Sequence, residues 1–262
     1  MTGIQQISQA FRQAESENRA ALMPYLTGAY PDPDRFRQDA AKLLESADLI
    51  EVGLPYSDPL GDGPTIQASS QAVLKAGTTV AQVLDLIGEL TVHGKPVLVM
   101  TYYNPIYCYP GGEQGFLEAL ARRGVAGVIL PDLPPEEAGS LRETAAALGL
   151  ATVFLIAPTT TEERLRLVTQ ASTGFVYCVS VTGVTGARDS VAGDLPGMLG
   201  AARTVTDLPL AVGFGVSDGR TAAEVAKVAD GVIVGSAIIA RQARGEDLSD
   251  FAVELAAGCV RD

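Results

Sequence analysis

Short apolar segments alternate with amphipathic segments about eight times along the 262 residues of the chain. This alternation is typical of β-strands that are each followed by a helix and that pack into one parallel sheet. The apolar segments are hydrophobic almost without interruption, as expected for strands covered on both faces. The sequence therefore predicts a (β/α)8 barrel, or TIM barrel, with strands at Leu22–Thr27, Leu49–Leu54, Val97–Tyr102, Gly127–Pro131, Thr152–Ile156, Phe175–Ser180, Leu210–Phe214 and Gly231–Gly235.

The segments between these strands carry the end signals of helices, such as a glycine after the last apolar residue or acidic residues in the first turn. An extra amphipathic helix precedes the first strand and is expected to cap the bottom of the barrel. Two further helices fit into the long connection after the second strand. The expected helices include Ile4–Glu17, Pro64–Ala76, Thr79–Thr91, Phe116–Arg123, Pro135–Leu148 and Thr161–Ala171.

Length and charge limit the kind of protein further. A chain of this size with 47% hydrophobic residues can bury one sizeable core, so we expect one domain, 1–262. The net charge of −12 argues against nucleic acid or an anionic membrane as a partner. The polar stretch Met1–Ala20 resembles neither a signal peptide nor a membrane span, which favours a cytoplasmic protein. Cys108, Cys178 and Cys259 are expected to be reduced, structural thiols.

Two acidic residues stand out at the end of the second expected strand. Glu51 lies within an otherwise apolar strand, where a carboxyl group is costly unless chemistry requires it. Asp62 follows in a loop rich in proline and glycine that can turn back over the strand end. Two acids in unlike surroundings are suited to separate acid and base roles. A structural salt bridge is the alternative for Glu51, but no basic residue is near in the sequence.

The carboxyl ends of barrel strands usually hold the chemistry, and here they are polar. Period-two alternation places Tyr177 inside the barrel. The loops after the last three strands contain Gly183–Gly186, Gly213–Gly215 and Gly235-Ser236. Glycines and a helix N-terminus let backbone amides bind a phosphate without lysine, so these loops predict a phosphate site. A simple turn function for each glycine pair is the alternative.

Other common catalytic groups, a Schiff-base lysine or a set of metal ligands, are missing from the expected strand ends. None of the four lysines follows a strand, so no Schiff-base lysine is expected. The only histidine, His93, precedes the third strand, and no cluster has the spacing of metal ligands. We therefore expect no metal site. Asp58 is expected in a turn or an interface, and Asp132 either in a turn or as support for a catalytic group.

The stretch Glu51-Val-Gly-Leu-Pro-Tyr-Ser-Asp-Pro-Leu-Gly-Asp-Gly-Pro-Thr-Ile-Gln67 closely resembles the signature of the tryptophan synthase α subunit family. The resemblance continues along the chain, in Ala21–Pro31, Pro131–Pro134, Val181–Gly186 and Gly235–Ile238. The family mostly has Phe at Tyr56 and Ala at Gly61, and both departures leave the two acids unchanged.

The resemblance implies a lyase that cleaves indole-3-glycerol phosphate to indole and D-glyceraldehyde 3-phosphate by a retro-aldol reaction. Glu51 would move protons at the breaking bond, and Asp62 would bind the indole N–H. Thr185 would lie on a closing loop and contact Asp62. Tyr25, Tyr102, Ile129, Tyr177 and Phe214 would line the indole slot, and Gly186, Gly213, Gly215, Gly235 and Ser236 would hold the phosphate.

The resemblance also implies a partner, the pyridoxal-phosphate β subunit, in an α2β2 heterotetramer, with no cofactor in this chain itself. Pro105–Pro110 and the Pro55–Pro59 turn are expected docking surfaces. Three alternatives remain at this stage. The chain could be a phosphate-handling isomerase, although the usual Cys/Asp or Lys/Glu pair is missing. It could be a non-catalytic activating subunit, or a free enzyme that releases indole as its final product.

Overall fold

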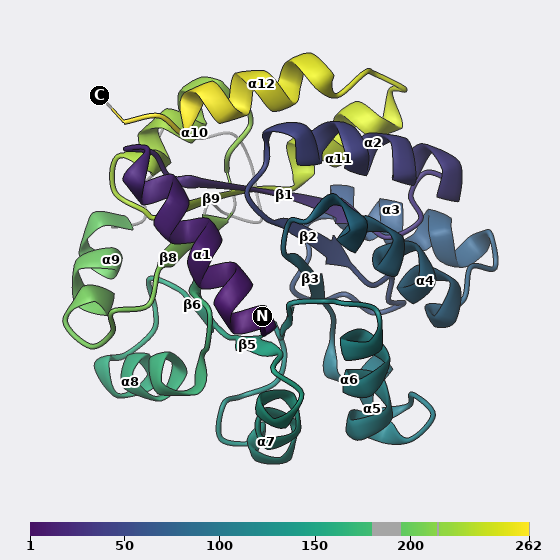
Figure 1. Cartoon of the computed structure of the whole chain (residues 1–262), viewed down its shortest axis with the longest axis horizontal. Helices are drawn as coiled ribbons and strands as arrows, with labels where there is room; N and C mark the ends of the chain where they lie inside the picture. Colours follow the sequence, from purple (N-terminus) through teal and green to yellow (C-terminus); the bar gives the residue numbers. More distant parts are fainter. Residues whose placement is uncertain (180–194, 214, 262) are drawn as a thin grey trace.

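The computed structural model describes residues 1–179, 195–213 and 215–261 (Figure 1). Its strands form one sheet in the order β5-β4-β3-β2-β1-β9-β8-β7-β6, and all of these pairings are parallel. The strands are β1 Ala21–Thr27, β2 Ile50–Gly53, β3 Val97–Met100, β4 Gly127–Ile129, β5 Ala151–Val153, β6 Leu155–Ile156, β7 Val176–Val179, β8 Leu210–Gly213 and β9 Gly231–Val234. The predicted TIM barrel is confirmed.

One predicted strand is wrong in detail, because Thr152–Ile156 is two short strands, β5 and β6. The carbonyl of Val153 accepts a hydrogen bond from the Leu130 amide after β4, at 3.1 Å. The carbonyl of Phe154 accepts one from the Tyr177 amide of β7, also at 3.1 Å. The chain changes its pairing partner at Phe154, which divides the strand. The two ends of the sheet therefore meet at consecutive residues, and the sheet curls into a barrel.

Helices surround the sheet (Figure 1), and most of those predicted start and end within a few residues of the expected positions. The helix predicted at Phe116–Arg123 begins four residues earlier as α6. The helix predicted at Pro135–Leu148 begins four residues later as α7. Its first part forms turns in which Glu137 and Ala138 donate to the carbonyls of Pro134 and Pro135. The helices are α1 Gly3–Ser16, α2 Pro33–Ser46, α3 Pro64–Lys75, α4 Val80–Leu90, η1 Thr91–His93, α5 Tyr103–Tyr107, α6 Gly112–Arg122, α7 Gly139–Ala147, α8 Glu162–Ala171, α9 Leu195–Arg203, α10 Gly219–Ala226, α11 Ser236–Ala243 and α12 Ser249–Gly258.

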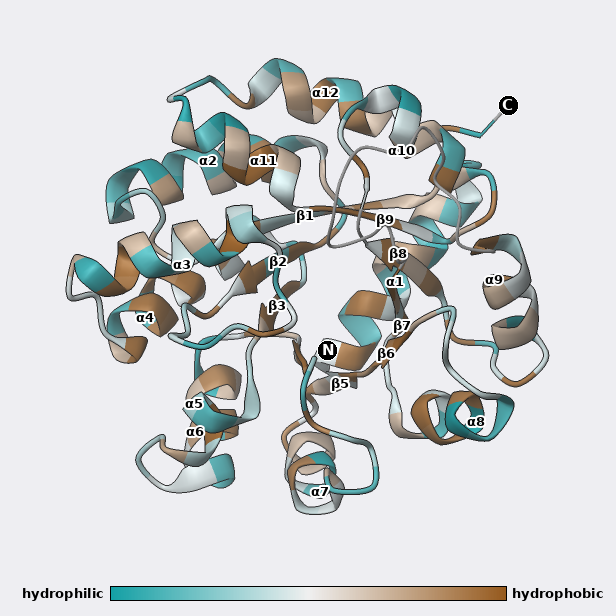
Figure 2. Cartoon of the chain, turned by 180° about the vertical axis from the view of Figure 1, so that it is seen from behind, coloured by the Kyte–Doolittle hydropathy of each residue, from teal (hydrophilic) through white to brown (hydrophobic). Residues whose placement is uncertain are grey.

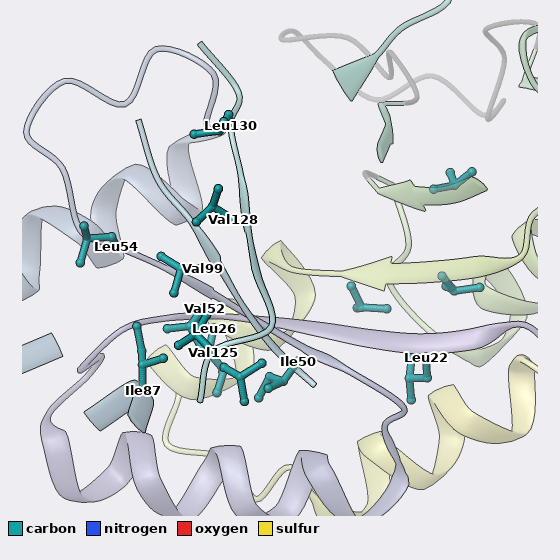
Figure 3. Packing of buried hydrophobic residues seen from close by; sticks show 14 of the residues in the cluster. Leu22, Leu26, Ile50, Val52, Leu54, Ile87, Val99, Val125, Val128 and Leu130 are labelled. Carbon is teal, nitrogen blue, oxygen red and sulfur yellow. The ribbon is translucent and has the colours of Figure 1, made fainter. Parts of the chain in front are cut away.

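Alternate strand residues build two separate apolar layers. One layer fills the space between strands and helices, and Figure 3 shows part of it, including Ile50, Val52 and Val99 from neighbouring strands. Figure 2 shows the same arrangement, with apolar strands inside a ring of helices that carry most of the polar residues. The other layer fills the barrel interior and contains Tyr177, while its neighbour Cys178 belongs to the outer layer. The predicted inward direction of Tyr177 is confirmed.

Helix α1 closes the amino-terminal end of the barrel, as predicted, and Figure 1 shows it lying across the strands. Its apolar residues Ile7, Phe11 and Ala14 are buried in the interior layer. The ring of Phe11 packs 5.7 Å from that of Phe175, the residue before β7. The helix therefore covers the end of the barrel at which the strands begin.

Two further features bear on the expectations above. Within the described residues, no helix is long and apolar enough to cross a membrane. The three cysteines are unpaired, with Cys178 and Cys259 buried and Cys108 exposed.

Candidate active site

A small cavity of about 60 Å³ opens among the carboxyl ends of the strands. The two acids selected from the sequence lie in its wall, together with aromatic and aliphatic side chains. Residues from β1, β2, β3, β7 and β9 and from the start of α3 and α11 contribute to it. The lining residues are Tyr25, Glu51, Asp62, Ile66, Met100, Tyr177, Gly215, Val216, Ile233, Gly235 and Ser236.

Glu51 occupies an inward position of β2, paired in register with Tyr25 of β1 and Leu98 of β3. Its side chain is fully buried, and neither carboxyl oxygen has a hydrogen-bond partner among the described residues. Burial raises the pKa of Glu51 from 4.5 to about 8, and the nearby charge of Asp62 adds to the shift. The group is therefore mostly protonated at neutral pH. The alternative of a salt-bridged structural glutamate does not fit these observations.

Asp62 reaches the same cavity from the loop between β2 and α3. Partial burial raises its pKa from 3.8 to about 6, and a hydrogen bond with the Tyr102 hydroxyl acts in the opposite direction. The same hydroxyl accepts a hydrogen bond from the amide of Gly61 at 2.9 Å. Asp62 is therefore mostly ionised at neutral pH, while Glu51 is mostly protonated. This difference in protonation is what separate acid and base roles would require.

Two glycines in the strands make room for the tyrosines of the cavity. A Cβ atom at Gly53 would overlap the Tyr25 hydroxyl, and one at Gly213 would overlap the Tyr177 hydroxyl. Burial raises the pKa of both phenols well above 10.0, so both stay protonated. The lack of a side chain at Gly213 thus has a local packing reason beside the phosphate role expected for it.

The amino-terminal end of α11 forms another wall of the cavity. Gly235 precedes the helix, and its carbonyl accepts the first helical hydrogen bonds, from the amides of Ile238 and Ile239. A Cβ at Gly235 would come no closer than 3.5 Å to Tyr25, so the space beside this glycine is open. The first amides of a helix have no partners within it and attract anions. Gly215 adjoins the same wall with a φ of +84°, a conformation that favours glycine.

Most of the predicted site residues that the structure describes meet in this cavity: Tyr25, Glu51, Asp62, Tyr177, Gly215, Gly235 and Ser236. Ile129 is buried deeper in the barrel interior, and Tyr102 stands behind Asp62 rather than in the wall. Thr185, Gly186 and Phe214 lie outside the described residues.

The sequence analysis missed four lining residues, Ile66, Met100, Val216 and Ile233. Period-two alternation could have identified two of them, since Met100 follows the inward Leu98 and Ile233 precedes Gly235 by two. Nothing in the sequence pattern singles out Ile66, on the first turn of α3, or Val216, in a loop.

The other acids near the strand ends have local partners. The Asp132 carboxylate accepts hydrogen bonds from the amide of Tyr103 at 2.9 and 3.1 Å and so caps the start of α5. Asp58 is exposed and accepts a hydrogen bond from the Ser57 hydroxyl at 2.5 Å. Within residues 1–179, 195–213 and 215–261, no three His, Cys, Asp or Glu side chains gather as metal ligands.

An apolar surface lies beside the loop that carries Asp62. We call it the proline surface, because three of its residues are prolines. It includes Pro55, Tyr56, Leu74, Val80, Pro105, Cys108, Tyr109 and Pro110 around a groove of about 470 Å³. Nearby, Leu60 is 93% exposed and Tyr107 is 68% exposed. Exposed apolar residues gathered in this way mark interaction sites.

Comparison with known proteins agrees with this arrangement. Residues 11–258 match the model of the family described as tryptophan synthase alpha chain. The tryptophan synthase alpha chain of Deinococcus radiodurans is 52% identical over 261 residues, which cover 99% of this chain and 96% of that protein. The corresponding chain of a Picosynechococcus species is 46% identical and covers 91% of each.

Solved structures show the same similarity in three dimensions. A structure of Mycobacterium tuberculosis tryptophan synthase superposes with a TM-score of 0.90 at 40% identity and covers 98% of both chains. A structure of the a2b2 complex of tryptophan synthase from Pyrococcus furiosus has a TM-score of 0.84 at 38% identity. It covers 91% of this chain and 98% of that one.

Proposed function

Because the chain belongs to the tryptophan synthase alpha chain family, we propose that Glu51 and Asp62 carry out the reaction of that family. The chain is a carbon–carbon lyase of tryptophan biosynthesis. Its reaction is the retro-aldol cleavage of indole-3-glycerol phosphate to indole and D-glyceraldehyde 3-phosphate. The proposal concerns which groups of this chain perform each proton transfer.

In this proposal Glu51 gives its proton to C3 of the indole ring. Protonation at C3 turns the ring into an electron sink and leaves Glu51 as a carboxylate. That carboxylate then removes the proton from the glycerol hydroxyl next to the ring. The bond between the ring and the glycerol carbon breaks, its electrons return to the ring, and an aldehyde forms. Glu51 ends the cycle protonated, and a pKa of about 8 suits both steps near neutral pH.

Asp62 is proposed to accept the hydrogen bond of the indole N–H. Protonation at C3 places positive charge on the ring nitrogen, and an ionised carboxylate beside it stabilises that charge. The pKa of about 6 keeps Asp62 ionised under the conditions in which Glu51 is protonated. The aromatic walls formed by Tyr25 and Tyr177 suit a flat, apolar ring.

The observation that carries the proposal is the state of Glu51. Glu51 is fully buried, faces the cavity and has no hydrogen-bond partner within the part of the chain that the structure describes. Such a carboxyl group costs folding free energy, which favours a catalytic role for it. A non-catalytic activating subunit would have no use for such a group. The phosphate of the substrate is proposed to bind the amides at the start of α11, with Gly215, Gly235 and Ser236.

We also propose the partner and its arrangement. The solved a2b2 complex of Pyrococcus furiosus supports an α2β2 assembly in which a β subunit consumes the indole. Pyridoxal phosphate would belong to that subunit, and this chain would need no cofactor of its own. The proline surface is the proposed contact, because it is apolar and adjoins the loop of Asp62.

The purified chain is expected to release indole from indole-3-glycerol phosphate, and Asp62→Asn is expected to remove most of that activity. The substitution should leave affinity for glycerol phosphate within about twofold, because Asp62 is assigned to the ring nitrogen and not to the phosphate. Turnover and calorimetric titration of both ligands measure this. An equal loss of glycerol phosphate affinity would contradict the division between the two sites.

A further inference from the structure

The loop that delivers Asp62 to the cavity has little to hold it in place by packing. Asp62 stands between Gly61 and Gly63, which have no side chains, and Leu60 before them points into solvent with 93% exposure. A Cβ at Gly63 would meet nothing within 4 Å. The position of the carboxylate must therefore come from hydrogen bonds.

Two side chains form hydrogen bonds with this loop. The Tyr102 hydroxyl accepts from the Gly61 amide at 2.9 Å and is hydrogen-bonded to the Asp62 carboxylate. The Gln67 amide group donates to the carbonyl of Asp62 at 2.8 Å and to that of Pro59 at 3.4 Å. One NH₂ group has two hydrogens, so it can join both carbonyls at once. The turn from Pro59 to Asp62 has its own backbone hydrogen bond, from the Asp62 amide to the Pro59 carbonyl at 3.0 Å, and Gln67 ties this turn to α3.

Gln67 itself is held in place by the helix on which it lies. It lies on the first turn of α3, where its own amide donates to the Gly63 carbonyl at 3.0 Å. The helix is joined to β1 by a buried hydrogen bond of 2.6 Å between Thr27 and Ser69. The β1 strand also carries Tyr25 of the cavity wall. Gln67 therefore connects the backbone of Asp62 to the barrel, through α3 and the bond between α3 and β1.

The side chain of Gln67 is exposed, and it does not line the cavity. An exposed hydrogen bond contributes little to the stability of the whole fold, whereas a small displacement of a catalytic group strongly slows a reaction. We propose that Gln67 is a positioning residue, which holds the Asp62 carboxylate where it can meet the indole N–H. The role of Asp62 itself rests on the function proposed above.

The test compares Gln67→Met and Gln67→Glu with Gln71→Glu. Methionine keeps the length of the side chain but has no hydrogen-bond donor. The carboxylate of glutamate would be repelled by the two carbonyl oxygens that now accept from Gln67. Gln71 is also exposed and lies one turn further along α3, so Gln71→Glu is the matched control for charge. Both Gln67 variants should lower kcat by at least about tenfold and change KM by less than about threefold. Gln71→Glu should keep wild-type kcat, and all variants should unfold within about 2 °C of the wild type.

A double variant shows whether Gln67 acts through Asp62. Gln67→Met added to Asp62→Asn should cause no further loss, because the group that Gln67 positions is already missing. Multiplied losses would overturn the proposal, as would wild-type kcat in Gln67→Met or equal losses in Gln67→Glu and Gln71→Glu.

Hydrogen exchange of residues 58–63 gives a second measurement that needs no turnover. Exchange in this loop should be at least about tenfold faster in Gln67→Met than in the wild type and in Gln71→Glu. Unchanged exchange would overturn the positioning role even in an active enzyme. A wild-type chain that releases no indole would instead contradict the proposed function, and the exchange result would still decide whether Gln67 holds the loop.

Discussion

At the scale of single residues, the buried carboxyl group of Glu51 makes the stability of the fold decrease as pH rises. Its carboxyl group is enclosed beside the charge of Asp62, with no hydrogen-bond partner in residues 1–179, 195–213 and 215–261. Between the ordinary pKa of 4.5 and the raised value of about 8, the folded chain holds the proton more tightly than the unfolded chain. The stabilising contribution is fully present below about 4.5 and is lost as pH rises through about 8.

Glu51→Gln is therefore expected to gain stability relative to the wild type as pH increases. The amide has no proton to lose, so the difference in Tm should grow by at least about 2 °C between pH 5 and pH 9. Thermal unfolding across this range measures it. Glu45→Gln, at an exposed position of α2, is the control. Parallel curves of Tm against pH for the wild type and Glu51→Gln would show that Glu51 is not buried as described.

At the scale of elements, the strands and the two acids of the cavity could be predicted from sequence because the signals are local. Continuous apolar runs gave strand positions to within two residues, and period-two alternation gave the inward face of Tyr177. The division of Thr152–Ile156 could not be predicted, because it depends on where the barrel closes. The contacts of Tyr102 and Gln67 with the Asp62 loop could not be predicted either. They depend on how a loop folds back in space.

Helix α11 provides a clean test of the proposed phosphate site. Gly235 has a φ of −116°, which any residue can adopt, and a Cβ there meets only ordinary contacts. Gly235→Ala should therefore keep Tm within about 2 °C, yet weaken glycerol phosphate binding by at least about tenfold, or about 1.4 kcal/mol. Affinity for free indole analogues should change much less.

Gly213→Ala is the informative contrast, because its Cβ would overlap the Tyr177 hydroxyl. It should destabilise the fold by about 1–3 kcal/mol. Thermal unfolding and calorimetric titration separate the two effects. Unchanged phosphate affinity in Gly235→Ala would remove the start of α11 from the proposed site.

At the scale of the whole molecule, the two ends of the barrel differ in structure. Helix α1 seals one end with Ile7, Phe11 and Ala14, and the other end carries the cavity. The proline surface adjoins the loop of Asp62, so a partner bound there would lie close to the cavity. This arrangement suits a product that passes from one subunit to the next.

Tyr107→Glu is expected to weaken assembly with the β subunit by at least about tenfold in Kd, because it places a charge on an apolar contact. Tyr107 ends α5 beside the proline surface and is 68% exposed, so folding should be unaffected. Val253→Glu is the control, at a 61% exposed position on α12, far from α5 in Figure 1. Calorimetric titration of each variant with the β subunit provides the comparison. Equal affinities would place the interface elsewhere.

The most direct test of the account is the rate at which Glu51→Gln releases indole from indole-3-glycerol phosphate. The substitution preserves the shape of the side chain and removes its acid and base functions. We predict a folded protein, by circular dichroism and thermal unfolding, whose kcat is lower than that of the wild type by at least about a hundredfold. Wild-type turnover by a folded Glu51→Gln chain would contradict the account, because the proton transfers would then belong to another group.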